Sequence, residues 1–154
     1  MAGKIEARLA ELGITLPDAP APAANYVPWT TTGNLVFISG QVSGAGDEKH
    51  VGRLGADLDV AAGQRAARIC ALAVLAQVKA ACGGDLDRVK RCVKLGGFVN
   101  CTPEFDQMPA VMNGASDLMV EVLGDAGRHS RFAVGAPNLP FGFAVEVDAV
   151  FEIG

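Results

Sequence analysis

The stretch "FAVEVDAVFEI", residues 143–153, decides the fold of this chain. Ala144, Glu146, Asp148 and Val150 fall on one parity, and Val145, Val147, Ala149 and Phe151 fall on the other. A period of two predicts a β-strand with one apolar face toward a core and a second face that carries the two acids. The rest of the chain must therefore supply a sheet around this strand.

Working outward from this strand, the pattern predicts the order β-β-(β)-α-β-α-β-β. Further strands are expected at 35–40, 87–100 and 131–134, a loop or long hairpin arm at 44–59, and helices at 3–13, at 60–82 after the cap Asp59, and from Thr102-Pro103-Glu104 to 123. Two long helices that follow strand groups predict an α+β domain with both helices on one face of the sheet. Residues 1–21 are expected to be an N-terminal helix and an extended Pro/Ala-rich tether, and residues 22–154 one domain.

The bulk composition limits the functional classes. The chain has 154 residues, half of them apolar, and a formal net charge of −4, which predicts one well-cored domain. The basic residues of "RVKRCVK" (88–94) alternate with apolar ones, which indicates a strand with one solvent-exposed face. We therefore expect no nucleic-acid partner. No apolar run is long enough for a membrane span, so no membrane partner is expected either.

The four cysteines show no zinc spacing, and the two histidines stand alone. We therefore expect no metal and no cofactor. The cysteines lie mostly in apolar runs and are interpreted as reduced and structural, which favours a cytoplasmic setting. The N-terminus is amphipathic and lacks the apolar core of a secretion signal.

Arg131 is an isolated charge in an apolar stretch, fifteen residues before Glu146. A sheet with helices on one face leaves its other face bare, and such a face favours oligomerisation. Arg131 and Glu146 are then expected at a subunit junction. An arginine there needs an anionic partner, either Glu146 or a small-molecule carboxylate.

Three motifs occur in order along the chain. They are "GNLVFISGQV" (33–42), "VNCTPEF" (99–105), and Arg131 followed eight residues later by Leu139-Pro140 and then by "VEVDAV" (145–150). Together they resemble the YjgF/RidA family, the reactive-intermediate deaminases, also called L-PSP endoribonucleases. The resemblance covers about residues 22–153, and the longer N-terminus indicates a divergent subgroup.

The resemblance implies a chorismate-mutase-like fold: a six-stranded, mostly antiparallel sheet with two helices on one face, assembled as a homotrimer with clefts between subunits. It implies hydrolysis of enamines and imines derived from amino acids, such as 2-aminoacrylate, to 2-keto acids and ammonia. Arg131 would then bind the substrate carboxylate and Glu146 would orient the attacking water. Gly40 (through its backbone N–H), Tyr26 and Asn100 would complete the cleft.

The sequence also departs from the family pattern. Ala133 stands where the family typically has a cysteine, and Pro28-Trp29 replaces the usual polar residues. A non-catalytic binder of small carboxylates, or a regulatory protein with the same cleft, is the alternative function. A ribonuclease is disfavoured by the acidic pI and the absence of a basic stripe.

Overall fold

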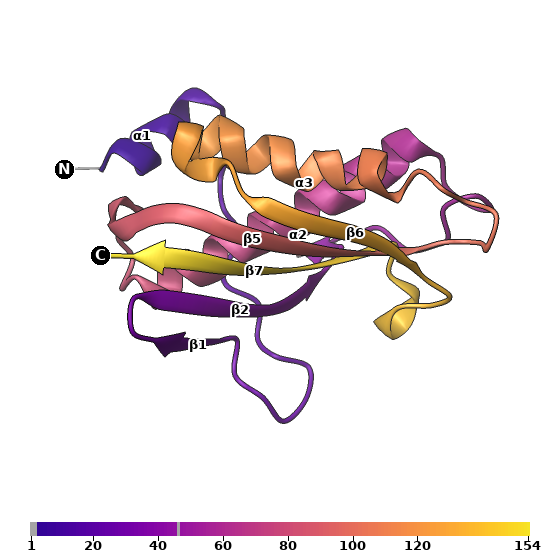
Figure 1. Ribbon diagram of the computed structural model, residues 1–154, viewed down its shortest axis with the longest axis horizontal. Coiled ribbons are helices and arrows are strands. Elements are labelled where there is room, and N and C mark those ends of the chain that lie inside the picture. The colour runs from indigo at the N-terminus through magenta and orange to yellow at the C-terminus, as the bar shows by residue number, and fades with distance from the viewer. Residues whose placement is uncertain (1–2, 46) are drawn as a thin grey trace.

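The alternating segment forms β7 (Val145–Ile153), the central strand of a five-stranded sheet. The computed structural model describes residues 3–45 and 47–154. The order of strands is β1 (Trp29–Thr32), β2 (Leu35–Val42), β7, β5 (Val89–Asn100) and β6 (Ser130–Ala136). Pairing is antiparallel except between β5 and β6, so the sheet is mixed (Figure 1).

The expected sixth strand of this sheet is absent from the described residues, and that prediction was wrong. The glycine-rich arm instead folds back on itself as β3 (Gly44–Ala45) and β4 (Glu48–Lys49), a separate two-stranded ribbon. The ribbon consists of two small residues and two charged ones, so it has no face of large apolar side chains to bury by joining the main sheet.

Two helices cover one face of the sheet, as the sequence predicted. α2 (Val60–Ala81) packs against β2 and β7, and α3 (Met108–Leu123) packs against β5 and β6. The side chain of Asp59 caps α2, accepting the N–H of Ala62 at 2.8 Å. In Figure 1 the strands lie in front of α2, so the view is onto the face that the helices leave bare.

The predicted start of α3 was wrong. Residues Pro103 and Glu104 form a turn, and the helix begins at Met108, with Gln107 as its N-cap residue and Pro109 in its first turn. The N–H of Thr102 is committed to the carbonyl of Leu54 at 3.0 Å. Thr102 therefore continues the pairing at the end of β5, and its carbonyl accepts the N–H of Phe105 at 3.2 Å in a single turn that does not continue as a helix.

The imperfect alternation of β5 has a physical cause. Register shifts occur between Val89 and Arg91 and between Cys92 and Lys94. Each irregularity offsets the side-chain alternation, and Cys92 and Leu95 both end fully buried. All four cysteines are buried with free thiols, and burial raises the pKa of Cys92 to about 12.

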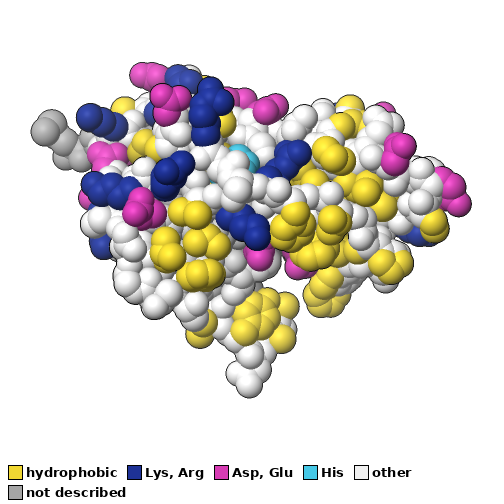
Figure 2. Space-filling view, in the orientation of Figure 1, with side chains coloured by type: hydrophobic (Ala, Val, Ile, Leu, Met, Phe, Trp, Pro, Cys, Tyr) yellow, Lys and Arg dark blue, Asp and Glu magenta, His cyan; other side chains and the backbone are white. Residues whose placement is uncertain are grey.

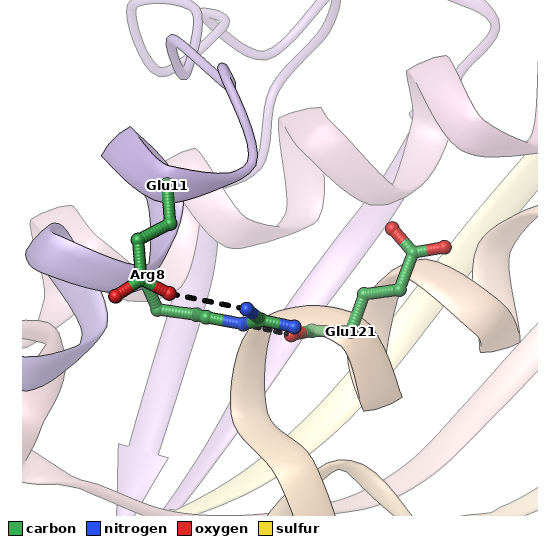
Figure 3. Close-up of polar contacts among 3 residues, drawn as sticks. All are labelled: Arg8, Glu11 and Glu121. Carbon is green, nitrogen blue, oxygen red and sulfur yellow. Dashed lines mark hydrogen bonds and ion pairs between the residues drawn. The ribbon is translucent and has the colours of Figure 1, made fainter.

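The N-terminal helix α1 (Lys4–Glu11) is docked on the helical layer. Arg8 lies between two acidic residues: its Nε donates to the carbonyl of Glu121 on α3 at 2.9 Å, and its Nη1 pairs with Glu11 at 3.2 Å (Figure 3). Leu9 is buried in the main core. The residues after α1 form the tether, which crosses from α1 to the β1 side of the sheet (Figure 1).

No helix in the described part of the chain combines the length and apolar character that a membrane crossing requires.

Candidate functional site

A cavity of about 690 Å³ lies at the end of β2, and we call it the β2 cavity. Its walls come from the tether (Pro20–Ala24 and Tyr26), from β2 (Ser39 to Val42), from Pro140-Phe141 and from Glu146 of β7. Segments far apart in the sequence thus meet around one space. The volume falls within the range of roughly 300–1,000 Å³ that small-molecule sites occupy.

A bulge in β2 shapes the floor of this cavity. The register with β7 shifts between Ile38 and Gln41, so that Ser39 and Gly40 together oppose one residue of β7. A Cβ atom added to Gly40 would lie 2.6 Å from Oε2 of Glu146. The carboxylate rests directly against the Gly40 backbone, so any larger residue at position 40 would displace it.

The carboxyl group of Glu146 has an altered proton affinity. Partial burial raises the pKa of Glu146, and the negative charge of Asp148, two residues along the strand, raises it further. Once ionised, a carboxyl group with a raised pKa accepts a proton more readily than an ordinary carboxylate does. Among the described residues, no cluster of three or more His, Cys, Asp or Glu is placed to hold a metal ion.

The tether wall is fixed by buried amides. Gln77 of α2, only 1% exposed, donates from Nε2 to the carbonyl of Pro20 at 2.6 Å and lies 3.4 Å from Oε1 of Gln41. Gln41 in turn donates to the carbonyl of Ser39 at 2.9 Å, inside the bulge. This chain of amides connects the helical layer, the tether and the bulge. It was missed by sequence reasoning, because a glutamine in an apolar helix carries no pattern that identifies its partner.

Arg131 lies elsewhere in the protomer. Its Nη1 donates to Oδ1 of Asn113 at 3.0 Å and to Oγ of Ser116 at 3.1 Å, both on α3. Nδ1 of His129 is 2.6 Å from the Gly127 carbonyl and therefore carries a hydrogen, so in neutral His129 the Nε2 atom accepts from Ser116 at 2.9 Å. Neutral groups thus hold Arg131, and the described residues offer it no carboxylate partner.

The register shows why Arg131 and Glu146 do not meet. Arg131 pairs with Leu95, which pairs with Ala149, and both partners are buried against the helices. Glu146 pairs with Phe98, which is 38% exposed on the bare face. The two side chains therefore leave opposite faces of the sheet.

Asn100 is not among the residues that line the β2 cavity. It is 1% exposed, and its Nδ2 donates to the carbonyl of Phe143 at 3.1 Å, while its Oδ1 is buried without a protein hydrogen-bond partner. In one protomer Asn100 supports the turn before β7. Of the five residues expected at the site, the structure brings together Tyr26, Gly40 and Glu146.

The mixed five-stranded sheet and the two long helices on one of its faces define an α+β protein. A family model described as "YjgF/chorismate mutase-like, putative endoribonuclease" matches residues 6–152. The chain belongs to this family.

Three relatives resemble the chain over nearly its whole length. Protein TCP17 of Trypanosoma cruzi is 52% identical over 98% of this chain and 95% of TCP17. The crystal structure of Atu1372 from Agrobacterium tumefaciens matches with a TM-score of 0.90 and 53% identity, covering 97% of this chain and 92% of Atu1372. That of a "putative endoribonuclease" from Shewanella oneidensis matches with a TM-score of 0.93 and 36% identity, covering 98% and 100% of the two chains.

Proposed function

We propose that the protein hydrolyses small imines and enamines derived from amino acids to 2-keto acids and ammonia, without a metal, in a cleft completed by a second copy of the chain. The observation that carries this proposal is the position of Glu146. Its carboxylate, with a raised pKa, rests on Gly40 at the wall of a cavity large enough for a small substrate.

The proposed reaction needs one group that moves protons. An enamine first tautomerises to its imine, and a water molecule then adds to the carbon of the C=N bond. Glu146 accepts a proton from this water and returns one to the nitrogen. The carbinolamine then expels ammonia, and the 2-keto acid remains. A carboxyl group with a raised pKa suits both directions of transfer.

Arg131 of a neighbouring copy would bind the substrate carboxylate. Its contacts in the protomer are neutral oxygens of Asn113, Ser116 and the carbonyl of Pro109. These contacts orient the guanidinium and leave its charge uncompensated. The planar guanidinium can bind a carboxylate through two parallel hydrogen bonds, which fixes the substrate relative to Glu146.

The bare face of the sheet supports assembly as a homotrimer, the state that the family resemblance implies. Phe37, Phe98 and Val134 are 43%, 38% and 42% exposed on it. Figure 2 views this face and shows several clusters of hydrophobic side chains separated by charged ones. Association would bury this apolar surface and bring β6 of one copy toward β7 of the next.

The charge of the β2 cavity disfavours a ribonuclease, the activity in the Shewanella relative's name. Among the described lining residues, Glu146 is the only charged side chain. A phosphodiester backbone carries negative charge and is bound through Lys and Arg. The lining that one protomer contributes therefore offers a phosphodiester no cation.

The direct test is ammonia release from 2-aminoacrylate generated in the assay, compared with the spontaneous rate in buffer. We expect the full-length protein to accelerate hydrolysis, and Glu146→Gln to lower kcat/KM by roughly a hundredfold or more. Glu152→Gln is the matched control, because Glu152 lies on the same parity of β7 and contacts Asn34. A wild-type rate equal to the buffer rate would contradict the enzymatic proposal and favour a non-catalytic carboxylate binder.

A further inference from the structure

A second cavity, of about 310 Å³, lies where the ends of β5 and β6 meet the start of α3. We propose that it binds a small monocarboxylate with a short apolar body, and that Arg53 is the group that binds the carboxylate. We call it the Arg53 cavity. Its other walls include Cys101, Phe105, Met108, Ala136 and Pro137.

The backbone around Arg53 is fixed before any ligand arrives. The Arg53 carbonyl accepts the N–H groups of Ala56, Asp57 and Leu58 at 3.2, 2.9 and 3.1 Å. The Arg53 N–H donates to Oδ2 of Asp57 at 3.0 Å. The next residue, Leu54, donates its N–H to the carbonyl of Asn100 at 2.9 Å, which ties the turn to the end of β5. A site held this firmly loses little entropy when it binds a ligand.

The guanidinium of Arg53 is only partly satisfied by the protein. Its Nη2 donates to the carbonyl of Cys101 at 3.2 Å. Its Nε is buried and has no protein hydrogen-bond partner. Within residues 3–45 and 47–154, no carboxylate lies within ion-pair distance of it. A partly buried cation without a counter-ion is unfavourable, and an anion in the cavity would relieve that cost.

The remaining walls restrict the chemistry of this anion. The side chains of Phe105, Met108 and Pro137 are apolar, and Arg53 is the single charged residue in the described lining. A phosphate or dicarboxylate carries more charge than one arginine can balance. A carboxylate with a few carbon atoms matches both the single cation and the volume, which is at the lower end of small-molecule sites, roughly 300 Å³.

This site is separate from the proposed function. The residues that line the Arg53 cavity and those that line the β2 cavity do not overlap. Neither Arg131 nor Glu146 lines the Arg53 cavity. The protein can therefore bind a carboxylate at Arg53 whether or not it hydrolyses imines.

Methionine methyl groups provide a local readout in the full-length protein. The chain has four methionines, of which Met108 lines the Arg53 cavity and Met119 is fully buried elsewhere in the core. In protein labelled with ¹³C at the methionine methyl groups, titration with butyrate should shift the Met108 signal to saturation and leave Met119 unmoved. Butyramide, the neutral analogue of similar shape, should bind at least about tenfold more weakly, because it lacks the charge.

Two substitutions complete the test. Arg53→Gln should weaken butyrate binding by about tenfold or more. Arg65→Gln, which removes an exposed arginine on α2, should leave it unchanged. A melting curve on each variant checks the fold. Three results would each overturn the proposal: no saturable Met108 shift with butyrate, equal binding of butyramide, or an unchanged shift in folded Arg53→Gln, which would place the anion at another cation such as Arg131.

Discussion

Arg131 and Glu146 project from opposite faces of one sheet, two strands and three register positions apart. With strands about 4.8 Å apart and about 3.3 Å per residue along each, their Cα atoms are about 14 Å apart. Arg131 is directed toward α3 and Glu146 toward the β2 cavity. No side-chain rotation within one protomer can bring them to the same small substrate. If both act in the proposed reaction, two copies of the chain must share each site.

The first prediction is complementation between inactive variants. Arg131→Ala and Glu146→Gln should each be nearly inactive alone. Co-expressed in equal amounts, they should recover roughly a quarter of the wild-type rate, because a quarter of randomly mixed interfaces pair an intact Arg131 with an intact Glu146. Ammonia release by the purified mixture measures the recovery.

Light scattering on the same preparation provides the control, since mixing requires an oligomer of the 15.9 kDa chain. A mixture that stays as inactive as its components while forming trimers would mean that the site does not combine these residues from two copies.

The second prediction concerns the shape of the cation at residue 131. Arg131→Lys keeps the charge and loses the planar pair of donors, so kcat/KM should fall by roughly tenfold to a hundredfold. The oligomeric state and the melting temperature should change little, because Arg131 makes no ion pair in the described protomer. Loss of assembly in this variant would instead indicate a structural arginine.

Much of the fold follows from sequence periodicity. The alternation of Val145, Glu146, Val147 and Asp148 predicts the central strand. The Asp59 cap predicts the start of the first long helix, and an apolar stripe predicts the second. The start of α3 could not be predicted in the same way. Thr102 and Pro103 carry a good local helix-start signal, but the backbone of Thr102 pairs with Leu54, a partner distant in sequence. Tertiary hydrogen bonding overrode local preference.

Sequence reasoning placed some of the candidate site residues in one cavity but could not place Arg131, for a similar reason. Tyr26, Gly40 and Glu146 were inferred through the family resemblance, and they do line one cavity. The face from which Arg131 projects depends on its pairing with β5, which the sequence does not encode locally.

The third prediction tests the close approach at Gly40. Gly40→Ala would place a methyl group 2.6 Å from Oε2 of Glu146, so the carboxylate must move. Activity should fall by roughly tenfold to a hundredfold, as expected when a catalytic group is displaced by about 1 Å. A glycine-to-alanine control at Gly33 would be unsuitable, because Gly33 has a positive φ of 57° and alanine there would strain the backbone. Ala24→Gly, in the tether wall of the cavity, removes a methyl group and adds no atom that could displace Glu146, so it should retain more activity.

The fourth prediction concerns the buried amide that holds the tether. Gln77→Leu preserves the approximate volume but leaves the Pro20 carbonyl without its 2.6 Å donor. The free energy of unfolding should decrease by about 1–3 kcal/mol. KM should rise more than kcat falls, because the cavity wall loosens while Glu146 keeps its position. Denaturant unfolding and steady-state kinetics on one preparation measure both effects. A variant with an unchanged KM would show that the tether does not shape the substrate site.

The fifth prediction uses the charge of Asp148 to move the pH profile. Glu146 must be ionised to accept a proton, so kcat/KM should fall as pH decreases through its raised pKa. Asp148 is one cause of that rise, and Asp148→Asn should lower the pKa of Glu146 and shift the acid limb of the profile to lower pH.

The same linkage acts on stability: a carboxyl group whose pKa is higher in the folded state loses its stabilising contribution as pH increases through that pKa. Asp148→Asn should therefore lose less stability than wild type over this interval. Asp117→Asn, an exposed acid on α3, should leave both curves in place. An acid limb that moves to higher pH, or that remains fixed in a folded Asp148→Asn variant, would show that Glu146 is not the titrating base.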